Sequence, residues 1–143
     1  MAQGDLTVFD EAKLALLNGT HDLDTHVIKV AILDNTTAPT AADATPALAG
    51  YTEVGAAGTY TAGGTTLTIS LTEAAGTVTF DATNNPTWAQ NASNDIDAYW
   101  GLIYNATDLS NSAIAFLDLG GPVDMTAGDL TITWNASGLF TIA

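Results

Sequence analysis

From Tyr51 to the end of the chain, turn-forming residues separate short runs rich in Thr, Val, Ile, Leu and aromatic residues, with a spacing of about ten positions. Runs of this length and spacing are typical of an antiparallel β-sandwich or a barrel-like domain. The runs expected to form strands are Thr65–Leu71, Thr77–Asp81, Ala98–Tyr104, Ala113–Asp118, Leu130–Trp134 and Leu139–Ile142. The chain is therefore predicted to be mainly β, and its 143 residues suit one domain with one core.

The last two of these runs are expected to pair with each other. The segment Asn135–Gly138 lies between them, and its Asn, Ser and Gly residues are those that turns favour. A β-hairpin is therefore predicted at the end of the chain.

The segment before these strands supplies the one expected helix. Apolar residues recur at spacings of three or four over Asp5–Leu17, acidic residues lie in the N-terminal half, and Asn18-Gly19 follows as a stop signal. The helix should dock on the sheet through Leu6, Phe9, Leu16 and Leu17.

A nearly continuous apolar run follows the helix at His26–Leu33. Its length and its β-branched residues predict a central strand that is buried on both faces. Residues 1–143 are thus expected to form a single structural domain, with an N-terminal helix or arm at 1–18 and a sandwich at 26–143.

The charge of the chain is strongly one-sided. Two lysines and no arginine stand against 16 Asp and Glu residues, so the formal net charge is −14. Nucleic acid and anionic membrane surfaces are bound through Lys and Arg, and both are therefore excluded as expected partners. The chain also has no cysteine, no signal-peptide pattern and no run of about 18 apolar residues that would predict a membrane span.

Two polar clusters contain residue types that bind metals. His21, Asp22, Asp24 and His26 are possible zinc ligands, but their spacing matches no metal motif, and a polar turn is the preferred interpretation. The Asn91–Asp97 segment could offer oxygen ligands to calcium, although it lacks the twelve-residue EF-hand frame and its closing Glu. A solvated acidic loop is the alternative interpretation there, and no metal or other cofactor is expected.

No catalytic arrangement is indicated either. Both histidines lie in one early segment, so no triad can be argued, and a glycosidase pair of carboxylates would need an aromatic-lined cleft. The Gly-rich segment Tyr60–Gly64 has neither the P-loop pattern nor a following helix, and it is interpreted as a tight turn. The chain is therefore predicted not to be an enzyme.

The remaining candidate residues are expected to serve packing. The three tryptophans, Trp88, Trp100 and Trp134, are interpreted as core and interface residues rather than as ligand-binding residues. The full set of candidate packing and interface residues is Leu6, Phe9, Leu16, Leu17, Trp88, Trp100, Trp134, Leu139, Phe140 and Ile142.

Several segments together resemble a known group of proteins. They are the helix end and strand at Leu16–Leu33, the segments Tyr51–Val54 and Tyr60–Gly64, Thr87–Ala89, Gly101–Thr107, and the ending Leu130–Ile142. In this order they resemble small virion structural proteins of tailed bacteriophages, which are capsid decoration or head–tail components. These segments carry no catalytic residues, so the resemblance implies a role and not a reaction.

The resemblance implies a non-enzymatic capsid decoration protein. Such a protein would form a symmetric homo-oligomer, with a trimer favoured, and would contact the major capsid protein or other virion proteins in a virion assembled in the host cytoplasm. A tail-tube, adaptor or fibre-base subunit of the phage tail is the alternative within the same class. A calcium- or glycan-binding β-sandwich module, using the Asn91–Asp97 segment, is the alternative from another class.

Overall fold

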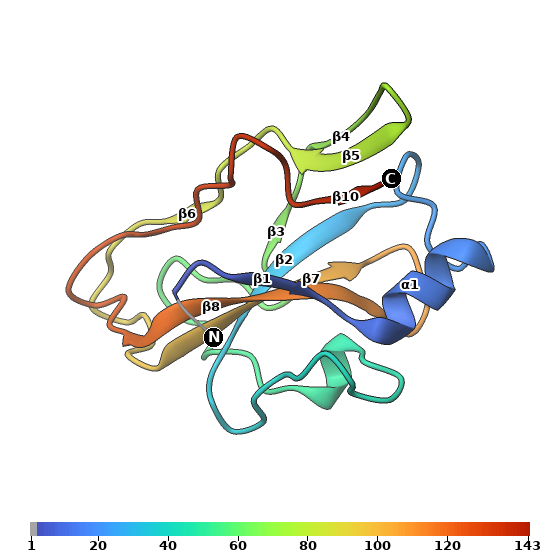
Figure 1. Ribbon diagram of the computed structural model, residues 1–143. Coiled ribbons are helices and arrows are strands. Elements are labelled where there is room, and N and C mark those ends of the chain that lie inside the picture. Colours follow the sequence, from blue (N-terminus) through green and yellow to red (C-terminus); the bar gives the residue numbers. More distant parts are fainter. Residues whose placement is uncertain (1–2) are drawn as a thin grey trace.

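The computed structural model describes residues 3–143 (Figure 1). Within this range the protein is mainly β, its paired strands are antiparallel, and one α-helix lies near the N-terminus, which confirms the predicted fold class. The elements are β1 Leu6–Val8, α1 Asp10–Leu17, β2 Ile28–Leu33, a 3₁₀ turn Leu48–Gly50, β3 Thr65–Thr66, β4 Ile69–Ala74, β5 Thr77–Ala82, β6 Thr87–Trp88, β7 Ala98–Asn105, β8 Ala113–Val123, β9 Leu130–Thr131 and β10 Phe140–Ile142.

The main sheet has five strands in the order β1-β8-β7-β2-β3. Strand β2 pairs with β7 along its whole length and with β3 at its start, so it lies inside the sheet. Val30, Ala31, Ile32 and Leu33 are completely buried, as the β-branched, apolar sequence of this run predicts. The prediction of a central strand buried on both faces is confirmed for Ile28–Leu33, whereas the first two residues of the predicted run, His26 and Val27, precede the strand and Val27 is 47% exposed.

A second layer covers one face of this sheet and gives the fold its sandwich-like form (Figure 1). It consists of a three-stranded sheet, β10-β5-β4, and a two-stranded sheet, β6-β9. The two layers meet at Gly101 of β7, where an added Cβ would lie 3.4 Å from Ile132, which follows β9, and 2.4 Å from Leu117 of the neighbouring strand β8. The opposite face packs under the long segment between β2 and β3, whose Tyr51 ring lies 6.3 Å from the ring of Phe9.

The N-terminal helix is shorter than predicted, because its first residues belong to the sheet. Leu6–Val8 form the edge strand β1 and pair with Ala115–Leu117 of β8, and α1 begins only at Asp10. Phe9 makes the transition in extended conformation and is completely buried. Two predicted roles are therefore wrong: Leu6 is not a helical residue, and Leu17 does not dock, because it is 89% exposed. Residues 1 and 2 of the predicted arm lie outside the described range.

The strand prediction also needs three corrections, the first of which is that the predicted strand Leu130–Trp134 is reduced to β9 at Leu130–Thr131. The predicted strand Thr65–Leu71 is divided into β3 and β4 by Leu67 and Thr68. The predicted C-terminal hairpin does not form, because β9 pairs with β6 and β10 pairs with β5. The turn itself is present, with the Gly138 N–H donating to the Asn135 carbonyl at 2.9 Å, but it passes the chain from one sheet to the other.

Candidate interaction surfaces

The three-stranded sheet separates apolar from polar side chains almost completely. Residues directly opposite each other in antiparallel strands share a face, so the register of these strands assigns each side chain to one side of the sheet. One face carries Ile69, Leu71, Glu73, Val78, Phe80, Ala82, Phe140 and Ile142, and the other carries Ser70, Thr72, Ala74, Thr77, Thr79, Asp81 and Thr141. The apolar face is directed toward the body of the protein.

This apolar face extends beyond the core. Phe80 is only 2% exposed, whereas Leu71 and Val78 are each 38% exposed and Ile142 is 54% exposed. The β4–β5 hairpin projects away from the main sheet above the end of α1 (Figure 1). Between the hairpin and α1 lies a groove of about 450 Å³. Leu23 and Phe80 are the buried apolar residues of its lining, and we call the partly exposed ones the apolar seam, which consists of Leu16, Leu71, Val78, Phe140 and Ile142.

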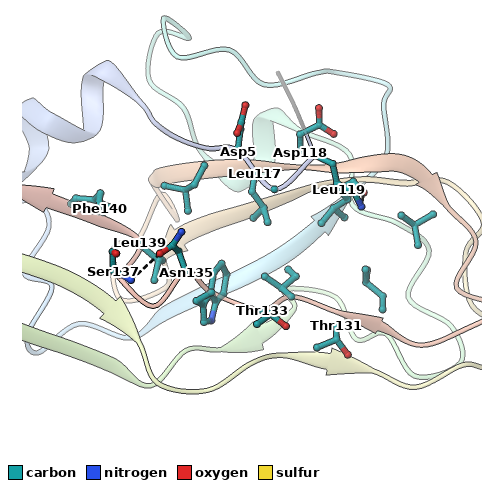
Figure 2. Close-up of a pocket in the computed structure, with 18 of the residues that line it drawn as sticks. Asp5, Leu117, Asp118, Leu119, Thr131, Thr133, Asn135, Ser137, Leu139 and Phe140 are labelled. Atoms are coloured by element: carbon teal, nitrogen blue, oxygen red, sulfur yellow. Dashed lines mark hydrogen bonds between the residues drawn. The ribbon is translucent and has the colours of Figure 1, made fainter.

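A larger groove lies on the open side of the sandwich, between the β1–β8 edge of the main sheet and the C-terminal segment (Figure 2). Its volume is about 720 Å³, and we call it the open-side groove. Its apolar lining residues are Leu6, Leu117, Leu119, Val123, Leu130, Ile132, Trp134, Leu139 and Phe140. The Trp134 indole is fixed, because its Nε1 donates to the Asn84 carbonyl at 2.8 Å.

The charged residues of the open-side groove are all acidic. Asp5, Asp118 and Asp129 lie at the groove, the side chains of Asp5 and Asp118 on the opposite face of the main sheet from Leu6 and Leu117, and none of the described lining residues is Lys, Arg or His. The Asp118 carboxylate accepts the Gly120 N–H at 2.7 Å, and the Asp129 carboxylate accepts the Gln90 N–H at 2.7 Å. Two of the three carboxylates are thus held in place by the backbone.

Two strand edges without charged residues or proline border the open-side groove. They are β1, at the edge of the main sheet, and β10, at the edge of the three-stranded sheet. Natural sheets commonly protect exposed edges with charges, proline or bulges. The segments Leu6–Val8 and Phe140–Ile142 contain no charged residue and no proline. Both edges are therefore suited to contact with another chain.

The two histidines converge on one buried amide. The Asn105 Nδ2 atom lies 2.8 Å from Nδ1 of His26 and 3.2 Å from Nδ1 of His21. The orientation of this amide is set by its Oδ1 atom, which accepts the N–H groups of Thr107 at 3.0 Å and Asp108 at 3.2 Å. With the amide in this orientation, both imidazoles accept at Nδ1.

The sequence cluster His21–His26 is thus a polar turn fastened to the end of β7. Asp22 accepts the N–H of Asp24 at 3.1 Å and the hydroxyl of Thr25 at 2.7 Å. Among residues 3–143, no group of three or more His, Cys, Asp or Glu side chains is placed to hold a metal ion.

Acidification should destabilise this turn. Burial is the main cause that lowers the pKa of His21 below 6.5, with His26 acting in the same direction and Asp108 against it. Because the unfolded chain then binds the proton more readily, the stabilisation is complete above pH 6.5 and is lost as the pH falls toward the folded-state pKa. The free energy of unfolding, measured with urea, should decrease between pH 7.5 and 5.

The variant His21→Gln is the control for this prediction, because it removes the titrating group. Its free energy of unfolding should depend less on pH over the same interval. The carboxylates Asp22, Asp95, Asp108 and Asp124 have lowered pKa values, which favour the ionised form, so their contribution is lost only below pH 3.8. An unchanged free energy of unfolding in the wild-type protein from pH 7.5 to 5 would contradict the assignment of the pH dependence to His21.

The Gly-rich segment Tyr60–Gly64 is a tight turn, as predicted. Tyr60 is 3% exposed, its hydroxyl donates to Glu53 at 2.5 Å, and it accepts the Ile32 N–H at 3.1 Å. Burial and the hydrogen bond to Glu53 raise the pKa of Tyr60, so the phenol remains protonated. The turn anchors its loop to β2.

The polar groups of the Asn91–Asp97 segment fasten loops together. Asn94 is 6% exposed, and its amide accepts the Thr59 N–H at 2.8 Å and donates to the Met125 carbonyl at 3.1 Å. Asp95 accepts the Gly55 N–H at 2.8 Å, which is the main cause that lowers its pKa. These side-chain oxygen atoms bind backbone N–H groups of a neighbouring loop.

The candidate packing residues other than the exposed Leu17 fall into three groups. Phe9 and Trp88 are core residues, and half-buried Trp100 packs edge-on against Phe116 with ring centroids 6.1 Å apart. The open-side groove brings together Leu6, Trp134, Leu139 and Phe140, and the apolar seam brings together Leu16, Phe140 and Ile142. The sequence reasoning missed Leu71 and Val78 as surface residues, although their alternation with threonine was a usable signal.

No family model, curated protein or solved structure matches this chain. Within the described residues, no helix has both the length and the apolar character needed to cross a membrane. Any function must therefore be inferred from the chain itself, and the apolar seam and the open-side groove are its two candidate interaction surfaces.

Proposed function

We propose that the protein is a non-enzymatic structural component of bacteriophage virions, a capsid decoration or cement protein that binds the outer capsid lattice as a symmetric oligomer. The sequence resemblance supports the virion role and the preference for a trimer. The observation that carries self-association is the apolar seam, which one copy of the chain leaves open to water.

The seam is suited to burial in a protein contact. Apolar surface removed from water contributes about 25 cal/mol per Å², and Leu71, Val78 and Ile142 are all substantially exposed. Glu73 shares their face, but its carboxylate accepts the Gly76 N–H of the hairpin turn at 2.8 Å. Next to the seam, Leu17 adds a further side chain that is 89% exposed.

Charge pairing cannot drive association between copies. Lys13 already pairs with Asp10 at 2.7 Å, Lys29 is half-buried in β2, and each copy carries a net charge of −14. Salt screens the repulsion, because the Debye length falls from about 30 Å at 0.01 M to about 8 Å at 0.15 M. Self-association through apolar and backbone contacts should therefore strengthen with salt.

The variant Leu71→Asp should separate the copies. It places a carboxylate in the seam, and we expect the association constant to fall by at least about tenfold, which corresponds to about 1.4 kcal/mol. Sedimentation velocity between 0.01 and 0.15 M salt measures the effect. The matched control is Thr72→Asp, which adds the same charge on the polar face of the same strand and should associate like the wild type.

The virion role is tested with phage particles that lack the protein. Purified trimers that co-sediment with capsids and saturate them would support decoration. Closed rings of six that bind tails would favour the tail-tube or adaptor role. A strict monomer at every salt concentration that also fails to bind such particles would contradict the proposal.

A further inference from the structure

We propose that the open-side groove binds an extended segment of a different protein, in which apolar and basic residues alternate, and that this segment adds as a strand to the free edge of β1. The groove shares only Phe140 with the apolar seam. The proposal therefore concerns a second surface and does not depend on the virion role.

The backbone of β1 offers a free edge for such a strand. Asp5 and Phe9 hydrogen-bond to β8, through the Asp118 N–H to the Asp5 carbonyl at 3.3 Å and the Phe9 N–H to the Ile114 carbonyl at 3.0 Å. Backbone groups of an antiparallel strand alternate in direction, so the N–H and C=O of Leu6 and Val8 are directed away from β8. A new strand can bond to these groups, as in β-augmentation.

The groove determines which side chains the new strand presents inward. Leu6 lies directly opposite Leu117 and shares its face, and both line the groove with Leu119. Ile132 and Leu139 line the groove from the C-terminal segment. Because alternate residues of a strand share a face, every second residue of the bound segment meets this apolar lining.

The remaining residues of the bound segment meet carboxylates. Asp5 and Asp118 precede and follow the pair Leu6 and Leu117, so their side chains lie on the opposite face of the sheet. Figure 2 shows both carboxylates directed away from Leu117 and Leu119. Same-face neighbours on adjacent strands interact, so a basic residue between two groove-facing apolar residues would lie beside Asp5, with the Asp118 carboxylate one strand further away on the same face.

The same charges argue against a second copy as the occupant. The chain has only two cations, Lys13 and Lys29, and neither lines the groove. Another copy would bring a net charge of −14 to an acidic rim. A segment in which apolar residues alternate with Lys or Arg fits both faces of the β1 edge.

The test uses a synthetic peptide of alternating Lys and Val, acetylated and amidated at its ends. Fluorescence anisotropy measures its Kd, and ¹H–¹⁵N NMR locates it through shifts at Leu6, Val8, Leu117 and Leu119. We expect binding that weakens at least about tenfold between 0.01 and 0.15 M salt, because the contact is between opposite charges. A peptide of alternating Glu and Val should not bind. A peptide of the same composition with its lysines and valines in separate blocks should bind at least about tenfold more weakly, because it cannot present one residue type to each face.

Two protein variants test the backbone contact. Leu6→Pro removes an N–H that makes no bond to β8, and Leu6→Ala removes the side chain but keeps that N–H. The Kd should be at least tenfold weaker for Leu6→Pro than for Leu6→Ala. If Leu6→Pro does not fold, an alternating peptide with N-methylated valines tests the same hydrogen bonds from the ligand side and should also bind at least tenfold more weakly.

Equal binding of the alternating and block peptides, or NMR shifts that avoid β1, would overturn the proposal. The result also separates this proposal from self-association. Leu71→Asp should retain peptide binding while losing its oligomer, and the salt dependence of the two processes should be opposite. If the protein forms its oligomer but does not bind the peptide, strand addition at β1 is refuted and self-association is not.

Discussion

Replacing Gly64 with alanine should prevent the chain from reaching its native structure. Gly64 has a φ of +65°, and a Cβ there would lie 1.9 Å from the Val30 carbonyl oxygen and 2.7 Å from the Ala31 Cα. The left-handed conformation alone costs a non-glycine residue about 1–2 kcal/mol. The overlap costs more, because β2 is held inside the sheet and cannot move away. The combined cost of the left-handed conformation and the steric overlap is large compared with a total free energy of unfolding of about 5–15 kcal/mol.

Soluble yield and the circular dichroism melting curve measure this effect. The matched control is Gly128→Ala, where an added Cβ meets nothing within 4 Å and φ is not positive. Gly128→Ala should melt like the parent. A Gly64→Ala variant that melts within a few degrees of the parent would show that the turn can relax.

Replacing Phe9 with aspartate should also abolish folding, and the same substitution at Leu17 should not. Phe9 is completely buried between β1 and α1, with its ring 4.9 Å from that of Phe116. An unpaired carboxylate in this position costs several kcal/mol. Leu17 is the last residue of α1, and its side chain is 89% exposed. The variant Leu17→Asp should therefore change the free energy of unfolding by no more than about 0.5 kcal/mol.

Urea unfolding of three variants measures this contrast. Phe9→Ala should fold with a free energy of unfolding that is lower by about 3–5 kcal/mol. This variant gives a measurable value if Phe9→Asp does not fold. Leu17→Asp serves as the control. Equal losses for Phe9→Asp and Leu17→Asp would mean that Phe9 is not a core residue.

The parts of the fold that could be predicted from the sequence depend on local patterns. The apolar run ending at Leu33 reveals a buried strand because both of its faces are covered and so no polar alternation is required. The Gly-rich turn at Tyr60–Gly64 was also predictable, because a loop with adjacent glycines and no P-loop pattern favours close packing. In both cases the decisive residues are neighbours in the chain.

The errors occurred where the decisive partner is distant. Leu6–Val8 has both helical and strand character in isolation, and only its pairing with Ala115–Leu117 selects the strand. The Asn135–Gly138 turn predicts a change of direction but not whether the following strand pairs with β9 or with β5. The apolar seam was missed for a related reason: strand alternation predicts the apolar face of β4 and β5, but not where the core beneath it ends.

The positions of the two lysines make limited tryptic digestion a probe of two kinds of opening. Lys13 is exposed on α1, so cleavage there requires only local fraying of the helix. Lys29 lies inside the main sheet, paired with Tyr104 on one side and Thr66 on the other. Trypsin reaches that bond only when β2 leaves the sheet, which amounts to global unfolding. Mass spectrometry of one digest would therefore report the local and the global opening of the same molecule as two separate fragments.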